Sequence, residues 1–194
     1  MLFEFPTEEL TVPGLRHFRR RVTPEMQTEL LETIDRSPWQ NELRRRVQQY
    51  GYRYDYRRKG LDVEARIGPL PDWSLELLDR FRREGLTDST FNQLIINEYT
   101  PGQGISFHVD CRPCFDDTIF SISLGSPCIL TMRQVGSNAT KDILLEPGDV
   151  LSMSGEARYD WQHGIAARKT DRTQGRVIKR GRRVSLTFRR VLDN

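Results

Sequence analysis

Two segments in the N-terminal half of the chain alternate apolar and polar positions with the period of an amphipathic helix. Thr23 and Pro24 are residue types that cap and start a helix, and the first pattern stops before Ser37. The second pattern predicts a helix over 71–84, with Gly85 directly after its end. The predicted apolar faces consist of Met26, Leu30, Leu31 and Ile34 in the first helix and of Leu75, Leu78 and Phe81 in the second.

Between these helices, aromatic and polar residues alternate with a period of two, which is typical of a β-strand. One strand over 50–56 would place four tyrosines on one face. The rings can pack on the rest of a sheet as a half-buried strand. Alternatively, because basic residues flank and interleave them, the face can stack unpaired bases and contact phosphates. The tyrosines are Tyr50, Tyr52, Tyr54 and Tyr56, and the basic residues are Arg46, Arg53, Arg57 and Arg58.

From Phe91 onward, short β-like runs are separated by turns that contain Gly and Pro. Many short strands at this spacing indicate a sandwich or barrel, with the double-sheet jelly roll among the candidates. Since helices come first and strands follow, the predicted fold class is α+β. The predicted strands cover 92–99, 104–109, 118–124, 128–134, 142–145, 149–153, 162–167 and 183–191.

The composition is that of a folded chain with one core. The chain has 194 residues, of which 37% are hydrophobic and 29% charged. We expect a helical N-terminal extension with a Tyr/Arg-rich lid over 1–88, packed on a core domain over 89–194. No apolar run approaches the about 20 residues that span a bilayer, and the N-terminus lacks a secretory pattern. With only three cysteines, these features predict a soluble, cytoplasmic protein, which we expect to be a monomer.

Charge is unevenly distributed, although the formal net charge is only +3. Residues 91–157 include three basic and eight acidic residues, whereas 158–190 include eleven basic and two acidic ones. Tight basic clusters lie at 19–21, 44–46 and 57–59. Such clustering is typical of a protein that binds a polyanion, but a solvated Arg-rich surface explains it equally well.

His108 and Asp110 lie at the end of a predicted strand, so their side chains share one face with Cα atoms about 6–7 Å apart. His163 begins another predicted strand far along the chain. Two imidazoles and one carboxylate leave positions open on an octahedral metal, as in non-haem Fe(II) oxygenases. A single His-x-Asp pair is more often structural, so the polar residues on other strands decide between the two interpretations.

Residues 183–189 alternate strictly between polar and apolar types, which places four polar side chains on one strand face. Two inward arginines would be costly without an anion, and a dicarboxylate fits because a guanidinium binds carboxylates through two hydrogen bonds. Asn97 and Tyr99 share a face of another predicted strand and provide neutral donors for the same ligand. The polar positions of the first strand are Arg183, Ser185, Thr187 and Arg189.

Together these motifs resemble the AlkB family of Fe(II)- and 2-oxoglutarate-dependent dioxygenases. The resemblance covers roughly the second half of the chain and implies a double-stranded β-helix, the jelly-roll form of that superfamily. It implies that His108, Asp110 and His163 bind iron and form the catalytic centre, with 2-oxoglutarate and O2 as cosubstrates. The matching motifs are Asn97-Glu98-Tyr99, Pro101-Gly102, His108-Val109-Asp110, His163-Gly164-Ile165 and Arg183-x-Ser185-x-Thr187-x-Arg189.

The same resemblance implies a binding site for 2-oxoglutarate. Arg183 would pair with the carboxylate far from the iron. Arg189, with Asn97 and Tyr99, would support the end of the cosubstrate that chelates iron. Ser185 stands where DNA-repair members usually have Asn, and the site residues that the resemblance implies are Asn97, Tyr99, Arg183, Ser185, Thr187 and Arg189.

The substrate is less clear from the resemblance. DNA-repair relatives usually have an acidic residue two places after the iron-binding Asp, where this chain has Arg112. Other segments are more similar to the branch that includes a relative hydroxylating a modified wobble uridine in tRNA. We favour a nucleic-acid oxygenase that removes N-alkyl groups from unpaired or extruded bases, as in DNA or RNA alkylation repair. The alternatives are hydroxylation of a modified tRNA nucleoside, of a protein or of a small molecule, or a binding module without catalysis.

In this hypothesis the base is stacked by an aromatic residue, and basic clusters around Arg44 and Arg57 contact phosphates. The predicted substrate-binding residues are Tyr52, Tyr54, Arg112, Met153 and Arg158.

Three further residue types need an interpretation. Cys111-x-x-Cys114 can be a redox pair or half of a zinc site, but no four-ligand set with suitable spacing accompanies it. We therefore expect two ordinary thiols in a loop. We expect His17 at the surface among arginines, and Trp161 in the core rather than against substrate.

Overall fold

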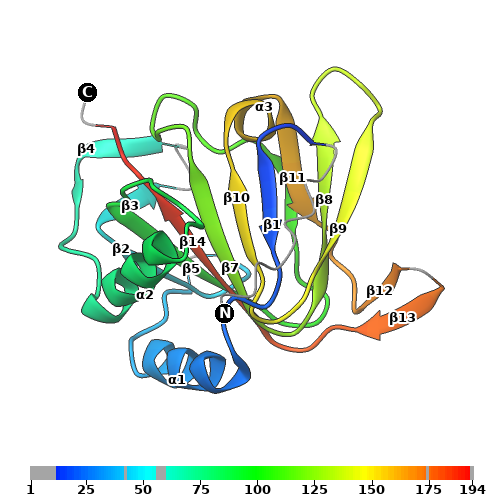
Figure 1. Ribbon diagram of the computed structural model, residues 1–194, viewed down its shortest axis with the longest axis horizontal. Helices are drawn as coiled ribbons and strands as arrows, with labels where there is room; N and C mark the ends of the chain where they lie inside the picture. Colours follow the sequence, from blue (N-terminus) through cyan, green and yellow to red (C-terminus); the bar gives the residue numbers. More distant parts are fainter. Residues whose placement is uncertain (1–11, 42, 56–59, 174, 193–194) are drawn as a thin grey trace.

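Two antiparallel sheets face each other (Figure 1). Residues of both sheets line one cavity between them. The computed structural model describes residues 12–41, 43–55, 60–173 and 175–192. The larger sheet has six strands, in the order β1 (Leu15–Phe18), β10 (Val150–Met153), β7 (Ile119–Gly125), β14 (Arg183–Arg189), β5 (Gln93–Tyr99) and β2 (Val47–Tyr50). The smaller sheet has four, in the order β6 (Ile105–His108), β11 (Trp161–Ile165), β8 (Cys128–Gln134) and β9 (Thr140–Leu145).

This pair of sheets forms a double-stranded β-helix, so the predicted jelly-roll architecture is confirmed. Each strand predicted after Phe91 is present, with boundaries shifted by at most a few residues.

Helices α1 (Pro24–Asp35) and α2 (Asp72–Arg83) cover one face of the larger sheet (Figure 1) and bury their apolar residues against it. As predicted, Thr23 caps α1, where its side chain accepts a hydrogen bond from the backbone N–H of Met26. The prediction for Leu75 is wrong. Its side chain is 41% exposed, because the buried face of α2 is centred instead on Leu77, Leu78 and Phe81.

Strand β14 lies between β7 and β5 and separates the two apolar clusters of the protein. Its apolar side chains, Val184, Leu186 and Phe188, are fully buried on the side of the helices. Its polar side chains point into the cavity between the sheets. The predicted alternation of β14 is therefore confirmed, and it places a row of polar groups inside the fold.

The N-terminal part of the chain contains strands as well as helices, and the predicted α+β class with a jelly-roll core is confirmed. Strands β1 and β2 form the two edges of the larger sheet. His17, expected at the surface, is buried in β1, and its Nε2 lies 2.8 Å from Oδ2 of Asp149. A buried imidazole needs such a partner, and nothing in the local sequence identifies it. The predicted boundary at residue 88 stays a prediction.

The expected strand over 50–56 is interrupted at Gly51. This residue has a φ of +79°, and a Cβ there would clash with the carbonyl oxygen of Asn92. After the bend, β3 (Tyr52–Asp55) pairs with β4 (Gly60–Arg66) in a separate two-stranded sheet. The tyrosines therefore do not share one face, because Tyr50 packs on the helix side, and Tyr52 and Tyr54 pack on the cavity side. Tyr56 and the 57–59 cluster lie outside the described residues.

Besides the N-terminal strands β1, β2 and β4, two features have no counterpart in the predicted elements. One is the short helix α3 (Gly155–Tyr159), and the other is a hairpin of β12 (Thr170–Thr173) and β13 (Arg176–Lys179) that extends from the body of the molecule (Figure 1). Within the described ranges, we find no helix with the length and hydropathy that a membrane crossing requires.

The contrast between two leucines of α2 tests this packing. We expect Leu78→Ala to lower the free energy of unfolding by about 2–5 kcal/mol, because it leaves a cavity at a fully buried site. Leu75→Ala, on the exposed side of the same helix, should change it by no more than about 0.5 kcal/mol. Urea unfolding measures both values. Equal losses for the two variants would contradict the observed orientation of α2.

Candidate functional site

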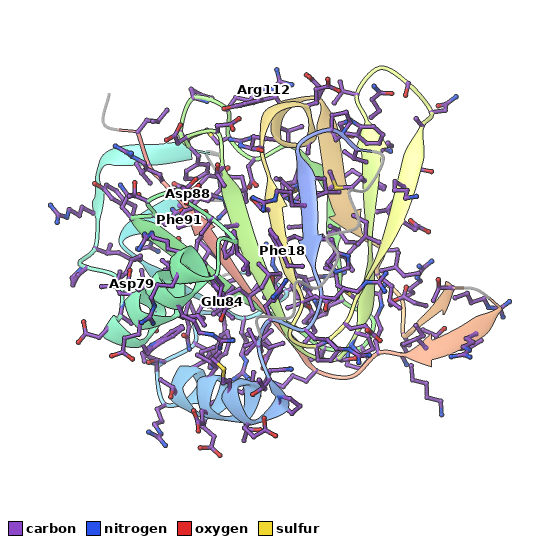
Figure 2. The ribbon with its side chains drawn as sticks, viewed as in Figure 1. Phe18, Asp79, Glu84, Asp88, Phe91 and Arg112 are labelled. Atoms are coloured by element: carbon purple, nitrogen blue, oxygen red, sulfur yellow. A yellow bond between two sulfur atoms is a disulfide. The ribbon has the colours of Figure 1, made fainter. Side chains whose placement is uncertain are left out.

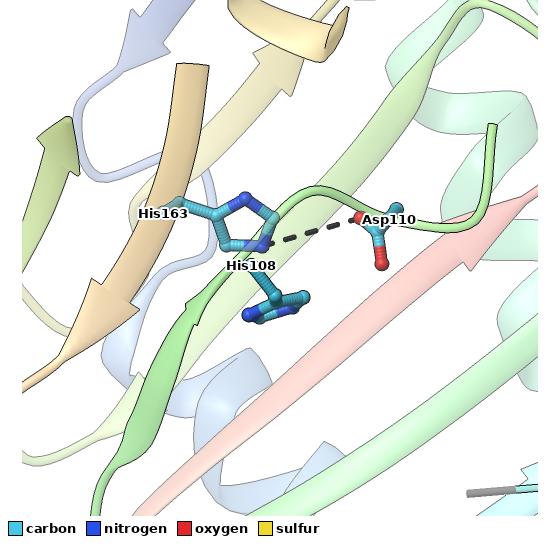
Figure 3. A group of neighbouring side chains, drawn as sticks. All are labelled: His108, Asp110 and His163. Carbon is cyan, nitrogen blue, oxygen red and sulfur yellow. Dashed lines mark ion pairs between the residues drawn. The ribbon is translucent and has the colours of Figure 1, made fainter. Parts of the chain in front are cut away.

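The side chains of His108, Asp110 and His163 come together (Figure 3), and the two histidines line the cavity between the sheets. Strands β6 and β11 pair with His108 directly opposite His163, and the centroids of the two rings are 4.3 Å apart. Asp110 follows β6, and its Oδ2 lies 4.0 Å from Nε2 of His163. One potential ligand atom from each residue lies within 4.8 Å of the others. The three predicted side chains therefore form a cluster that one cation can bridge.

The hydrogen bonds of the cluster suit a metal ion. Oδ1 of Asp110 accepts a hydrogen bond from Nη2 of Arg189, whereas its buried Oδ2 has no hydrogen-bond partner within the described part of the chain. Such an orphaned buried oxygen is rare and indicates a missing partner. Nδ1 of His108 lies 2.8 Å from the carbonyl oxygen of Ser106, to which it can only donate, and this leaves Nε2 free to bind a cation. Two imidazoles and a carboxylate with open positions fit Fe(II).

The electrostatics of the cluster favour the protonation states that bind metal. Burial alone would raise the pKa of Asp110, but the positive charge of Arg189, with that of nearby imidazoles and Arg158, holds it well below its ordinary value. Burial, together with His108, lowers the pKa of His163 to about 3. At neutral pH, Asp110 is therefore ionised and His163 is neutral, as metal ligation requires.

Arg158 binds the backbone of the loop that bears Asp110. This guanidinium is only 2% exposed and donates from Nη1 to the carbonyl oxygen of Asp110, at 2.9 Å, and from Nη2 to that of Cys111, at 3.0 Å. Arg158 is thus buried, and it fixes the backbone of the loop. Its predicted contact with substrate stays a prediction. The prediction of two free thiols is wrong, since Cys111 and Cys114 form a disulfide across the same loop.

The six residues predicted to bind 2-oxoglutarate all line one cavity of about 70 Å³, together with His108 and His163. The larger sheet provides the polar wall, and the smaller sheet and β10 provide an apolar one. Arg183 donates from Nε to Oγ of Ser123 at 2.9 Å, and its buried Nη1 has no partner among the described residues. The polar wall consists of Asn97, Tyr99, Ser121, Arg183, Ser185, Thr187 and Arg189, and the apolar one includes Leu130, Leu145, Leu151 and Met153.

Arg189 occupies the end of this wall next to the cluster of His108, Asp110 and His163. Besides the Nη2 that contacts Asp110, its Nε and Nη1 are buried without a partner in the described ranges. Unpaired guanidinium donors thus lie at both ends of β14, on Arg183 and Arg189. A ligand with two carboxylates satisfies both, so the donor set fits a keto-diacid such as 2-oxoglutarate.

Three polar residues that line this cavity or contact its lining were not predicted from the sequence. Ser121 and Ser123 of β7 face the cavity, and their alternation with Phe120, Ile122 and Leu124 is the signal that could have identified them. Arg45 donates from Nε to Oδ1 of Asn97 at 2.8 Å. No local pattern indicates this contact, because it joins residues 52 positions apart.

The basic cluster at 44–46 is not a row of free cations. Arg45 contacts Asn97, and Arg46 binds Glu98 through two hydrogen bonds of 2.6 and 2.7 Å. Only Arg44 of the three is exposed. The predicted phosphate contacts around Arg44 therefore rest on one side chain, and those around Arg57 lie outside the described residues.

The other predicted substrate-binding residues surround the site at different depths. Tyr54 is half-buried, with its ring 6.1 Å from that of Phe115, and burial and the charge of Asp110 raise its pKa. Tyr52, like Tyr54, packs against the apolar cluster that includes Phe115, and Met153 lines the cavity. Arg112 is exposed and donates to the carbonyl oxygen of Tyr159; Figure 2 shows it at the end of the molecule where α3 lies. Trp161 is in the core, as predicted.

Comparison with known proteins places this geometry among oxygenases. The family described as "2OG-Fe(II) oxygenase superfamily" matches residues 13–189. The "Alkylated DNA repair protein ALKBH8 homolog" of Arabidopsis thaliana is 36% identical over 209 residues, which span 96% of this chain and 60% of that protein. The "tRNA (carboxymethyluridine(34)-5-O)-methyltransferase alkbh8" of Xenopus tropicalis is 36% identical over 203 residues, which span 92% of this chain and 32% of that protein.

A solved structure described as "The structure of OsALKBH1" aligns with a TM-score of 0.70, over 95% of this chain and 100% of that one, at 17% identity. At this identity the likeness concerns the fold. The chain thus spans less than two thirds of the two curated relatives, and it aligns over 95% of its length with the structural neighbour.

Replacing one guanidinium tests the cavity as a diacid site. We expect Arg183→Met to raise the apparent KM for 2-oxoglutarate by about 10- to 150-fold, because a hydrogen bond to a charged group contributes about 1.5–3 kcal/mol. Arg190→Met removes the same charge from an exposed neighbour and should leave the KM unchanged. Steady-state succinate formation measures both. An unchanged KM in Arg183→Met would contradict the assignment.

Proposed function

Because this chain belongs to the 2OG-Fe(II) oxygenase superfamily, and within it to the AlkB family, we propose that it oxidises modified bases of nucleic acid. The chain is a dioxygenase that uses Fe(II), 2-oxoglutarate and O2. The first assignment of its reaction is the oxidative removal of N-alkyl groups, as in DNA or RNA alkylation repair. We also propose that the enzyme is monomeric and cytoplasmic and that it acts on single-stranded nucleic acid or on an extruded base.

In this proposal, His108, Asp110 and His163 hold the iron, which with 2-oxoglutarate provides the oxidation of a substrate C–H bond by O2. Arg183 binds the far carboxylate of the cosubstrate. Arg189 keeps Asp110 ionised and oriented and pairs with the near carboxylate. The apolar wall of the smaller sheet keeps water from the cosubstrate, which strengthens each of these charged contacts.

The observation that supports a nucleic-acid substrate most directly is the position of β3. The ring of Tyr54 lies 6.1 Å from that of Phe115, and the guanidinium of Arg189 lies 5.1 Å from the same Phe115 ring. Arg53, the residue before Tyr54 in β3, is exposed. An aromatic ring near the candidate metal ligands can stack a base, and an exposed guanidinium on the other face of the same strand can contact a neighbouring phosphate. The names of both curated relatives also refer to nucleic acid, DNA in one and tRNA in the other.

Arg112 favours a second reaction, hydroxylation of a modified tRNA nucleoside. An exocyclic amine is a hydrogen-bond donor, and a guanidinium has no acceptor to bind it. Arg112 therefore suits a base that presents an oxygen at this position, such as a uridine. The similarity to the Xenopus relative, whose name specifies a carboxymethyluridine in tRNA, supports the same alternative.

One incubation separates the two reactions. The iron-loaded enzyme is incubated with 2-oxoglutarate, O2 and a panel of oligonucleotides that contain N-methylated bases or carboxymethyluridine. The masses of the products are measured by mass spectrometry. Loss of a methyl group with release of formaldehyde supports dealkylation, because a hydroxylated N-alkyl carbon leaves as the aldehyde. Gain of one oxygen supports hydroxylation of the nucleoside. If no oligonucleotide is changed or stimulates succinate formation, the nucleic-acid proposal is wrong.

The role of Tyr54 is tested by a pair of variants. We expect Tyr54→Ala to lower kcat/KM for the oligonucleotide by about 5- to 150-fold, because stacking contributes about 1–3 kcal/mol per base. Tyr54→Phe keeps the ring and should retain most of the activity. Succinate formation without oligonucleotide serves as the control and should be similar in all three proteins. Equal losses in both variants would assign the effect to the hydroxyl and contradict stacking.

A further inference from the structure

The hairpin of β12 and β13 pairs with neither of the large sheets (Figure 1). An isolated two-stranded hairpin is marginally stable in water, so it needs an anchor to keep one position. Its exposed surface includes Val177, an apolar residue that is 59% exposed. The hairpin therefore contributes little to the core of the fold.

A buried acid holds the base of the hairpin in place. Asp171 is fully buried, and its carboxylate accepts hydrogen bonds from Arg180 and Arg168, both at 2.7 Å, and from the backbone N–H of Ile129 in β8 at 3.1 Å. Arg180 also donates to the carbonyl oxygen of Ala166 at 2.6 Å. These contacts fix the direction in which the hairpin extends. They also engage the only acidic side chain between residues 168 and 180.

The remaining charges of the hairpin are all positive. Four basic side chains on it are exposed, and none of them forms a hydrogen bond or ion pair with a described residue. Asp171 cannot neutralise them, because its carboxylate is already bound to Arg168 and Arg180. The four are Lys169, Arg172, Arg176 and Lys179.

The pairing of the strands places two of these cations on one face. Arg172 is opposite Val177, and Lys179 is opposite Thr170, so these four residues share a face on which all are exposed. Diagonal neighbours in an antiparallel pair are about 7–8 Å apart, a spacing similar to that of successive phosphates on a nucleic-acid strand. Like charges held this close repel each other, and a polyanion removes the repulsion.

We propose that this face of the β12–β13 hairpin binds the phosphate backbone of the nucleic-acid substrate. The inference rests on the proposed function, and it adds a contact outside the candidate active site. Phosphate contacts hold and orient a strand without reading its sequence, so the hairpin raises affinity for any single-stranded substrate that reaches it. In Figure 1 the hairpin lies at the side of the molecule opposite to β3 and β4, so a substrate must be long to contact both.

Charge removal at two positions tests the proposal. The variant Arg172→Gln/Lys179→Gln keeps the anchor at Asp171. The control Arg36→Gln/Arg83→Gln removes the same number of exposed charges at the C-terminal ends of α1 and α2. Binding of a long, fluorescent single-stranded oligonucleotide is followed by anisotropy over a series of salt concentrations. We expect the slope of log affinity against log salt to fall by about 1.4 for the hairpin variant, at about 0.7 per phosphate contact. The control should keep the wild-type slope.

The outcomes separate this proposal from the proposed function. If the wild type binds and is stimulated by oligonucleotide while the hairpin variant keeps its slope, the hairpin proposal is wrong and the proposed function stands. If the wild type binds no oligonucleotide at any salt concentration, both are wrong. If instead the variant loses only its binding to phosphatidylserine vesicles, the hairpin contacts a membrane surface and the nucleic-acid assignment is overturned. Succinate formation without oligonucleotide should be equal in all proteins, which shows that they are folded.

Discussion

The whole site depends on the balance of charge around one buried carboxylate. Asp110 is only 8% exposed, and its Oδ1 is neutralised by Arg189, while its Oδ2 faces His163. Removing one partner of a buried ion pair costs about 3–5 kcal/mol, since the other charge is left uncompensated. A cation held by Asp110 and the two imidazoles would complete this balance. Because Asp110 needs these partners, the loop that bears it, strand β14 and Arg189 at the end of that strand must be positioned together.

Strand β14 meets this requirement because its two faces serve different purposes. One face is packed under the helices, and this fixes the strand without any polar contact. The other face therefore can bear unpaired donors toward the cavity, from Arg183 at one end to Arg189 at the other. The two arginines are held apart by the rigid ladder of β5 and β7, which sets the length of the diacid that fits between them. The pairing of β14 with β5 and β7 thus both stabilises the fold and sets the positions of the two arginines.

The sequence predicts the parts of this arrangement that depend on local pattern. The His-x-Asp spacing, the alternation of residues 183–189 and the cap at Thr23 each follow from one strand or helix. The parts that it misses depend on contacts between residues distant in the sequence. His17 is buried against Asp149, and Arg158 binds the carbonyl oxygen of Asp110, 48 positions earlier. The chain turns at Gly51, where a Cβ would clash with the carbonyl oxygen of Asn92. Leu75 shows that helical spacing alone does not identify the centre of a buried face.

A crystal structure grown without O2, in the presence of Mn(II) and 2-oxoglutarate, tests the central claim most directly. We expect one ion bonded to Nε2 of His108, Nε2 of His163 and Oδ2 of Asp110, with the cosubstrate between Arg183 and Arg189. An ion bound elsewhere, or 2-oxoglutarate outside this cavity, would contradict the account.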